Sequence, residues 1–235
     1  GKTTDFSAEM EVSAGELDKV VVTATRTERN LHELPSKVTV LDNADFVYGS
    51  ALSLSDALNF QNGVRIEVDC QTCNFTQVRM NGLGGGYTQI LINSRPVFSP
   101  LNGLYGLEQI PVSMLDRIEV VKGGGSALFG ANAVGGTINI ITKDPVYTHY
   151  SFTAHGQLPG GTASDAYADV NYSYIDESGK TGFSLFGVSR NRTPYDANND
   201  GFSELPLMQN LSAGLTSYYK TGDDAKLSLD FHRIY

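Results

Sequence analysis

The sequence predicts an α+β domain, with a mixed small sheet and short helices, followed by a run of antiparallel β-strands, so that β-structure dominates the chain. Two observations lead to this prediction. A glycine-dense segment between two β-branched runs, residues 115–143, closes the first part. Beyond Asp144-Pro145, apolar residues recur at every second position, which is typical of strands whose two faces meet different surroundings.

Residues 1–27 precede the first clear pattern of a folded core. Residues 1–16 are polar and irregular, and we expect a flexible terminus there. Residues 17–27, LDKVVVTATRT, are rich in β-branched side chains and predict an extended strand. This strand is either an ordinary edge strand or a segment that a partner recognises by strand addition through main-chain hydrogen bonds. No signal peptide begins at Gly1, so we expect a mature sequence.

Short strands and helices alternate between residues 28 and 114. Asp42 or Asn43 is a candidate helix cap, and residues 53–60 show helical spacing of apolar side chains before Asn62-Gly63 ends the helix. The predicted strands are 37–41, 64–68, 77–82 and 88–93, with turns at Asn81-Gly82 and Asn93-Ser94. Residues 94–110 contain two prolines and two glycines and predict a structured loop.

The segment 115–143 holds five glycines between Gly123 and Gly135. It opens on residues 117–121 and closes on residues 137–142, two β-branched runs that we interpret as paired strands. Their connection needs unusual backbone angles or very close backbone approach, which glycine allows. A nucleotide-phosphate loop is excluded, because the glycine spacing fits neither of the known phosphate-binding motifs.

Beyond residue 145, five segments alternate between apolar and polar side chains. In one of them Ala166, Val170 and Tyr172 alternate with Asp169 and Asn171. The predicted strands are 148–157, 166–174, 181–192, 209–220 and 227–232, joined by short turns at 176–180 and 221–225 and by long loops at 158–165 and 193–208. Alternation alone favours a transmembrane β-barrel and a soluble β-sandwich equally. Five strands cannot close a barrel, so a barrel implies a fragment or the ordered part of a longer chain.

The composition narrows the classes of function. The 235 residues include 17 Lys and Arg against 26 Asp and Glu, a net charge of −9, which disfavours nucleic-acid binding because such binding depends on phosphate neutralisation. No apolar segment reaches the roughly 18 residues that a transmembrane helix needs, which leaves a β-barrel open. No G-x-S-x-G or H-E-x-x-H motif is present, so we do not expect an enzyme.

The two cysteines, Cys70 and Cys73, lie in the sequence Cys-Gln-Thr-Cys. In an oxidising compartment the simplest interpretation is a local disulfide that fixes the tip of a loop. A thioredoxin-like redox pair lacks the surrounding βαβ pattern, and a metal site lacks further Cys or His ligands. Free thiols stay open as an alternative to the predicted disulfide.

Residues 196–204, DANNDGFSE, fit the first half of a calcium-binding loop. Oxygen ligands are expected at positions 1, 3, 5 and 9, which are Asp196, Asn198, Asp200 and Glu204. Position 12 is Leu207 rather than Glu, so a complete EF-hand is excluded. We predict a structural calcium ion here, and the alternative is an acidic loop that only faces solvent.

The segment 115–143 resembles the end of the plug domain in TonB-dependent outer-membrane receptors, where R-I-E-V, a glycine-rich link and G-G-x-I-N-I-I-T directly precede the barrel. Residues 17–27 and 54–143 are similar to the same family. The resemblance implies a plug domain at 28–145, the first strands of a transmembrane barrel at 146–235, and a bacterial outer-membrane location. It also implies a TonB-box region at 17–27 that binds the C-terminal domain of TonB, through Asp18, Lys19, Val20, Val21, Val22, Thr23 and Ala24.

The same resemblance assigns the substrate face to the plug apex, formed by residues 69–76 and 94–107. The residues expected to contact the substrate are Gln71, Thr72, Asn74, Arg95, Phe98, Ser99, Asn102 and Tyr105. Their amide and apolar groups suit a large, bulky ligand. In this family the equivalents of Arg117 and Glu119 are paired charges that face the barrel wall; the alternative is a surface ion pair of small value.

The apical segments look closest to cobalamin receptors of Bacteroidetes. The resemblance therefore implies an importer of cobalamin or another corrinoid, driven by TonB and the proton-motive force, and it allows calcium in an early loop and a surface lipoprotein cap. A haem or siderophore importer is the alternative within the family. Haem is disfavoured, because the four histidines, His32, His149, His155 and His232, avoid both apical loops. A non-transporting surface binding module is the alternative from another class.

Overall fold

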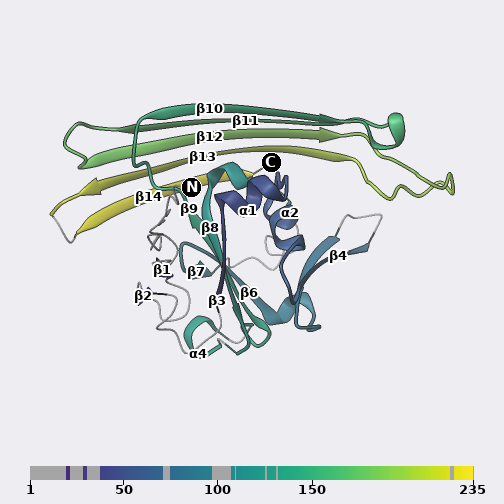
Figure 1. Ribbon diagram of the computed structural model, residues 1–235, viewed down its shortest axis with the longest axis horizontal. Coiled ribbons are helices and arrows are strands. Elements are labelled where there is room, and N and C mark those ends of the chain that lie inside the picture. The colour runs from purple at the N-terminus through teal and green to yellow at the C-terminus, as the bar shows by residue number, and fades with distance from the viewer. Residues whose placement is uncertain are drawn as a thin grey trace, which may run out of the picture.

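The computed structural model describes residues 20–21, 29–30, 38–70, 75–96, 107–108, 110–124, 126–130, 132–222 and 225–234. This part of the chain forms two layers (Figure 1). A long, curved sheet makes one side of the molecule, and a domain of shorter strands and helices lies against its concave face. We call the long sheet, strands β10 to β14, the wall, and residues 38–143 the N-terminal domain.

A five-stranded mixed sheet forms the base of the N-terminal domain. In spatial order its strands are β3 (Val38–Asp42), β8 (Leu115–Lys122), β9 (Gly136–Thr142), β6 (Thr88–Ile92) and β7 (Arg95–Pro96). Strands β6 and β9 run parallel, and the other neighbours run antiparallel. Strands β8 and β9 contain the two β-branched runs around the glycine-dense segment, so their predicted pairing is confirmed.

Two smaller strand pairs complete the β-structure of this part. Strands β4 (Val64–Cys70) and β5 (Phe75–Met80) form an antiparallel hairpin, and β1 (Val20–Val21) pairs with β2 (Arg29–Asn30). Strand β5 begins two residues before the predicted segment 77–82, and the turn predicted at Asn81-Gly82 is confirmed. Asn81 and Gly82 have φ values of +52° and +81° and turn the chain, because a strand cannot continue through left-handed backbone.

Side-chain caps begin the two α-helices of the N-terminal domain. Helix α1 (Asn43–Tyr48) is capped by Asp42, whose carboxylate accepts from the Ala44 N–H at 2.9 Å, as predicted. Helix α2 (Leu54–Asn59) is capped by Ser53 in a capping box with Asp56. The shorter helical turns are η2 (Gly85–Tyr87), η3 (Val112–Met114), α4 (Ser126–Phe129) and η4 (Pro159–Gly161). Among the described residues, no helix is both long and apolar enough to cross a membrane.

The core of the N-terminal domain lies between helix α2 and the mixed sheet. Its fully buried apolar side chains include Leu54, Leu58, Met80, Leu115, Ile118, Val120, Ile138 and Ile140. Each contributes about 1.5–3 kcal/mol by leaving water. Phe186 of the wall packs against this same core. The two layers are therefore joined by apolar contact as well as by polar groups.

The wall consists of five antiparallel strands in sequence order. They are β10 (His149–Gln157), β11 (Asp165–Ile175), β12 (Thr181–Arg192), β13 (Met208–Lys220) and β14 (Lys226–Ile234). Each predicted strand is present, and its ends differ from the prediction by no more than two residues. The predicted fold class, an α+β domain followed by antiparallel strands, is confirmed.

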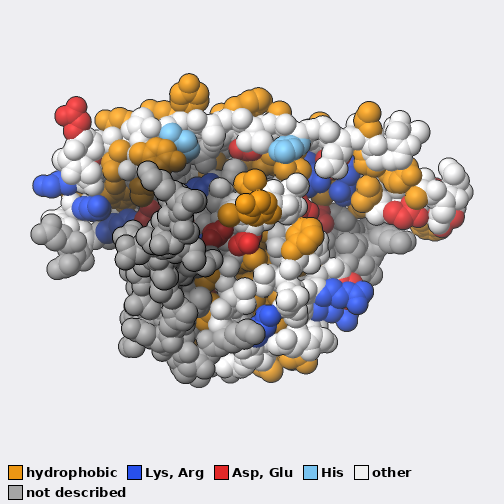
Figure 2. All heavy atoms as spheres, in the orientation of Figure 1, with side chains coloured by type: hydrophobic (Ala, Val, Ile, Leu, Met, Phe, Trp, Pro, Cys, Tyr) orange, Lys and Arg blue, Asp and Glu red, His pale blue; other side chains and the backbone are white. Residues whose placement is uncertain are grey.

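The wall has the opposite polarity to a soluble sheet. On β11 the side facing the N-terminal domain carries Asp165, Asp169 and Asn171, all buried, whereas Val170 and Tyr172 face outward and are exposed. Strand β10 turns Tyr150, 85% exposed, to the same outer side. Figure 2 shows hydrophobic side chains gathered along the outer margin of the wall. A soluble sandwich buries its apolar face, so this arrangement indicates a wall whose outer face meets lipid.

Candidate functional site

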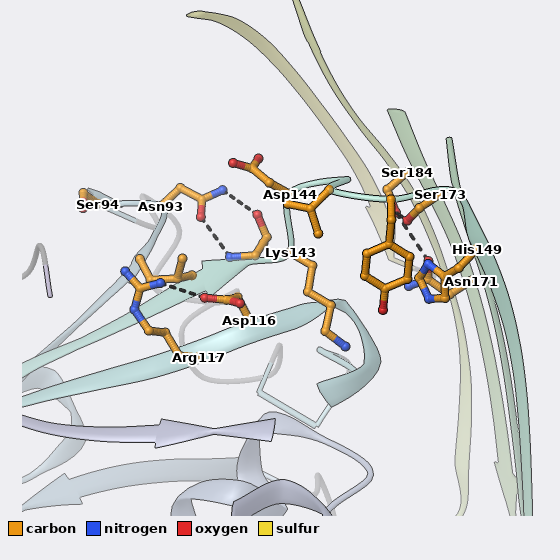
Figure 3. A pocket seen from close by; sticks show the side chains of 14 residues that line it. Asn93, Ser94, Asp116, Arg117, Lys143, Asp144, His149, Asn171, Ser173 and Ser184 are labelled. Atoms are coloured by element: carbon orange, nitrogen blue, oxygen red, sulfur yellow. Dashed lines mark hydrogen bonds and ion pairs between the residues drawn. The ribbon is translucent and has the colours of Figure 1, made fainter. Parts of the chain in front are cut away.

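Two cavities lie between the N-terminal domain and the wall. The first encloses about 510 Å³, and Figure 3 shows its polar side chains converging from both layers. It is lined by Asn93, Ser94, Asp116, Arg117, Ile141, Thr142, Lys143, Asp144, Val146, Tyr147, His149, Asn171, Ser173 and Ser184. The second encloses about 360 Å³ between helix α1, turn η3 and strands β10 and β11. We call this boundary, with its two cavities, the seam.

A charged group on β8 forms one side of the first cavity. Arg117 Nε donates to Glu119 Oε1 at 2.9 Å, and Arg117 Nη1 donates to Asp116 Oδ2 at 2.7 Å. Glu119 is fully buried, with 0% of the side chain exposed. Burial acts against the charge of Arg117, but the two carboxylates outweigh it and raise the pKa of the guanidinium. The expected pairing of Arg117 with Glu119 is thus present, and Arg117 reaches the cavity that the wall closes.

Lys143, the last residue of the N-terminal domain, lines both cavities. Its Nζ donates to the Ser113 carbonyl oxygen at 3.0 Å, and its backbone N–H donates to the Met114 carbonyl oxygen at 2.9 Å. Burial lowers the pKa of this ammonium group, and the charges of Asp116 and Asp169 offset part of that effect. The end of β9 is therefore fixed to turn η3 directly beside the wall.

Two side-chain amides hold the β6–β7 turn against β9. Asn93 Nδ2 donates to Thr142 Oγ1 at 2.8 Å, and the Thr142 N–H donates back to Asn93 Oδ1 at 3.0 Å. The Ser94 N–H donates to Asn139 Oδ1 at 2.9 Å, and Asn139 Nδ2 donates to Ser94 Oγ at 3.1 Å. Both turn residues have positive φ, +48° and +64°, as a two-residue type I′ hairpin turn requires. Ser94 adopts this backbone without being glycine.

A second charged group joins helix α2 to strands β11 and β12 of the wall. Arg190 on β12 donates twice to Asp165 on β11, at 3.0 and 2.8 Å. Its Nη1 also lies 4.0 Å from Asp56 Oδ2, the carboxylate that completes the capping box of α2. Both Arg190 and Asp165 are largely buried, at 12% and 7% exposed. A planar guanidinium suits this paired geometry better than a lysine would.

The predicted substrate and disulfide residues lie mostly outside the described residues. Of the substrate set, only Arg95 is described, and it is exposed in the edge strand β7. Gln71, Thr72, Asn74, Phe98, Ser99, Asn102 and Tyr105 fall in gaps, as does Cys73. The β4–β5 hairpin extends toward the end of the wall where loops 158–164 and 193–207 lie (Figure 1).

Of the predicted TonB-binding residues, only Val20 and Val21 are described. They form β1, which pairs antiparallel with β2, so this part of the segment is extended and its backbone can form a ladder. Asp18, Lys19, Val22, Thr23 and Ala24 fall outside the described residues. Three histidines, His149, His155 and His232, lie on the wall strands, and His32 is not described.

The predicted calcium loop has its oxygens bound to N–H groups. Asp196 accepts from the backbone of Asn199 and Gly201, at 2.6 and 2.9 Å, and Glu204 Oε2 accepts from the Ala197 N–H at 2.6 Å. Asn198 and Asp200 are bonded to each other and to the backbone nearby. Within the described parts of the chain, no three His, Cys, Asp or Glu side chains are grouped so that they could hold a metal ion. Calcium binding by Asp196, Asn198, Asp200 and Glu204 stays a prediction.

The polar residues on the inner face of the wall are the functional candidates that the sequence prediction missed. Asp165, Asp169 and Arg190 face the N-terminal domain. The signal was present in the alternation itself, because the polar positions of a barrel strand are the ones that face the lumen. The sequence could not show which residues of the N-terminal domain these side chains contact, because those residues lie far away in sequence.

Comparison with known proteins supports the same architecture. Residues 30–137 match the family described as TonB-dependent Receptor Plug Domain. A Vitamin B12 transporter BtuB from Vibrio vulnificus is 31% identical over 157 residues, covering 66% of this chain and 25% of that protein. The Vitamin B12 transporter BtuB from Photobacterium profundum is 26% identical over 220 residues, covering 90% of this chain and 34% of that protein.

Solved structures share the fold at lower identity. The siderophore receptor PirA from Acinetobacter baumannii has a TM-score of 0.68 at 21% identity, covering 83% of this chain and 31% of that one. The pyoverdine outer membrane receptor FpvA from Pseudomonas aeruginosa has a TM-score of 0.71 at 17% identity, covering 91% of this chain and 29% of that one. The chain thus spans a quarter to a third of these relatives. Residues 30–137 match the TonB-dependent receptor plug domain, and over most of its length the chain is similar to outer-membrane receptors of this kind.

Proposed function

We propose that the chain is the plug and the first wall strands of an active importer of a large, scarce ligand, with cobalamin or a related corrinoid as the cargo. The observation that carries the proposal is the inverted polarity of the wall around a plug domain, with polar side chains inward and apolar side chains outward. The corrinoid cargo is supported by the relatives named vitamin B12 transporters. Transport rather than catalysis is the proposed activity.

The proposed domain division follows from the same reading. In this division, residues 1–16 precede the TonB-box region at 17–27, the plug spans 28–145, and the first barrel strands span 146–235. In the proposed cycle, ligand binds at the plug apex, and the segment from Asp18 to Ala24 is released to pair with TonB by strand addition. Force from the inner-membrane motor then moves or partly unfolds the plug. The contacts at the seam, between the plug and the wall, resist that force, and they must separate for the plug to move.

A siderophore importer of the same fold is the alternative. The solved relatives with siderophore names are all similar at low identity, so they support the fold and leave the cargo to experiment. Haem is a further alternative; the three described histidines lie on the wall, and an iron ligand would have to come from there or from elsewhere in the protein. Closeness to Bacteroidetes receptors and a surface lipoprotein cap stay predictions from the sequence.

Calcium in the 196–204 loop also stays a proposal. A carboxylate has about four lone-pair sites, so Asp196, Asp200 and Glu204 could keep their N–H partners, but their oxygens would have to turn toward one ion. Calcium tolerates such flexible oxygen sites, and ordering of the loop would be its contribution. Asp196→Asn with Asp200→Asn is the matching variant. A calcium-dependent rise in the protease resistance of this loop, lost in the variant, is the expected result.

The test of the cargo is calorimetric titration of the full-length receptor in detergent. Cobalamin, haem and a ferric siderophore are titrated separately, each with calcium and with a chelator. Tight binding of cobalamin alone supports the corrinoid proposal. Tight binding of a siderophore or haem instead keeps the importer and overturns the proposed cargo.

A further inference from the structure

The second cavity of the seam contains buried polar atoms without hydrogen-bond partners. Asp169 is 4% exposed, and its Oδ1 has no partner; neither have His149 Nδ1 and Ser113 Oγ, which line the same cavity. The Tyr167 hydroxyl interacts with both Ser113 and Asp169, but at longer range than an ordinary hydrogen bond for Ser113 Oγ and Asp169 Oδ1. Buried polar groups in folded proteins are paired with protein or with ordered water, so three unpaired atoms around one cavity require an explanation.

Lys143 supplies the opposite charge at this cavity. Its ammonium group interacts electrostatically with Asp169 across the boundary between the two layers, yet no direct ion pair joins these two described side chains. Its Nζ donates instead to the Ser113 carbonyl oxygen at 3.0 Å. An ammonium has three donors, and this contact uses one of them. A carboxylate and an ammonium that face one cavity without touching leave room for water between them.

The cavity is large and polar enough to hold that water. Its volume of about 360 Å³ exceeds the roughly 30 Å³ that one water occupies in the liquid. Water needs two to four polar partners in such a site, and Asp169, His149, Ser113 and Lys143 provide them. A small ligand or metal ion is disfavoured here, because Lys143 already places a cation at the site and no metal-holding group of side chains occurs among the described residues.

We propose that Lys143 of the plug and Asp169 of the wall form a water-mediated ion pair, held in a hydrated chamber at the seam. The inference rests on the proposed function, since it takes the N-terminal domain as a plug inside a closed barrel. The two cavities share Lys143, His149 and Asn171, so the chamber adjoins the larger polar cavity shown in Figure 3. Water in place of direct contact leaves the plug attached here by bonds that exchange readily. Lys143 and Asp169 are thus positioning residues for the end of the plug.

The first test is a structure of the full-length receptor at a resolution that reveals ordered water. The expected result is water within hydrogen-bond distance of Asp169 Oδ1 and His149 Nδ1, with Lys143 Nζ reaching Asp169 through it. A direct contact between Nζ and the Asp169 carboxylate, or a chamber without water, overturns the proposal.

The second test is a double-mutant cycle with Lys143→Met and Asp169→Asn, read from hydrogen exchange at the residue 143 amide, which bonds to Met114. A water-mediated pair predicts a coupling of about two- to fivefold in the opening constant. Coupling of more than about tenfold indicates a direct buried pair, and coupling within error of unity indicates no pair; either result overturns the proposal. Asp230→Asn, an inner-face carboxylate on β14, is the control and should leave this amide unchanged. Neither test needs ligand or TonB. A failure of the proposed water-mediated ion pair can therefore be told apart from a failure of the proposed import function.

Discussion

Asn139→Ala should loosen the β6–β7 turn, because the buried Asn139 amide holds Ser94 in an unfavourable backbone conformation. Asn139 is 0% exposed, and it both accepts from the Ser94 N–H and donates to Ser94 Oγ. With φ at +64°, Ser94 occupies the left-handed region, which costs a residue with a side chain roughly 1–2 kcal/mol. The two hydrogen bonds offset that cost. The Asn139 amide therefore stabilises the turn, together with the hydrogen bonds between Asn93 and Thr142.

The structure allows the size of the effect to be estimated. Alanine at 139 removes two hydrogen bonds, worth roughly 0.5–1.5 kcal/mol each, and leaves the partly buried Ser94 N–H without its acceptor, which adds about 1–3 kcal/mol. Allowing for partial relaxation, we expect a loss of about 2–4 kcal/mol in local stability. At about 1.4 kcal/mol per factor of ten, this corresponds to a drop of roughly 30- to 1,000-fold in amide protection.

The assay is hydrogen exchange of the full-length receptor in detergent, followed at the amides of β6 and β9. Asn191→Ala is the matched control, because Asn191 is exposed on the wall and its side-chain amide donates to the neighbouring Ser189 hydroxyl. Ser94→Gly should change protection by no more than about tenfold, since relief of the backbone cost opposes loss of the Oγ bond. Unchanged protection in Asn139→Ala would refute the reasoning.

Three further predictions follow from the described contacts. Gly136→Ala should cost about 3 kcal/mol, since a Cβ there would overlap the Val121 carbonyl oxygen at a φ of +147°. Gly124→Ala, in open space, should cost under about 1 kcal/mol by the same exchange assay. Arg190→Ala should lower the stability of the wall by about 3–5 kcal/mol in thermal unfolding, because Asp165 is left buried and unpaired, and Arg190→Lys should recover only part of it. Hydrogen bonds from the Ser178 hydroxyl, which has the larger effect, and from the Thr181 N–H lower the pKa of the Asp176 carboxyl group below its usual 3.8. Protection of the Thr181 amide should therefore be complete above pH 3.8 and fall as the pH drops through the lowered pKa; in Asp176→Asn it should not vary over this range.

Local patterns predicted the elements of the fold well. Period-2 alternation located the wall strands, because the alternation of side chains across a strand is a property of the backbone itself. The cap at Asp42 and the pairing of β8 with β9 around the glycine-dense segment were also visible locally. The parallel pairing of β6 with β9 was not, because residues 88 and 136 are brought together only by the finished sheet.

The seam was beyond sequence reasoning for a related reason. Lys143, Asp169 and Arg190 each appeared as an ordinary polar residue in its own segment. Their role depends on which layer each side chain faces and on the contacts with Asp56 and Ser113, which lie far away in sequence. In the sequence, Ser94 appeared only as part of the predicted Asn93-Ser94 turn. The support that Asn139 gives to this turn from 45 positions away could be seen only in three dimensions.

The most direct test of the account is uptake of radiolabelled cobalamin by cells that depend on the full-length receptor, compared with a variant lacking residues 17–24. The account predicts that the variant still binds cobalamin at the cell surface but no longer imports it, because the proposed TonB-binding segment has been removed. Uptake that equals that of the unaltered receptor would contradict both the segment's role and the TonB-driven mechanism.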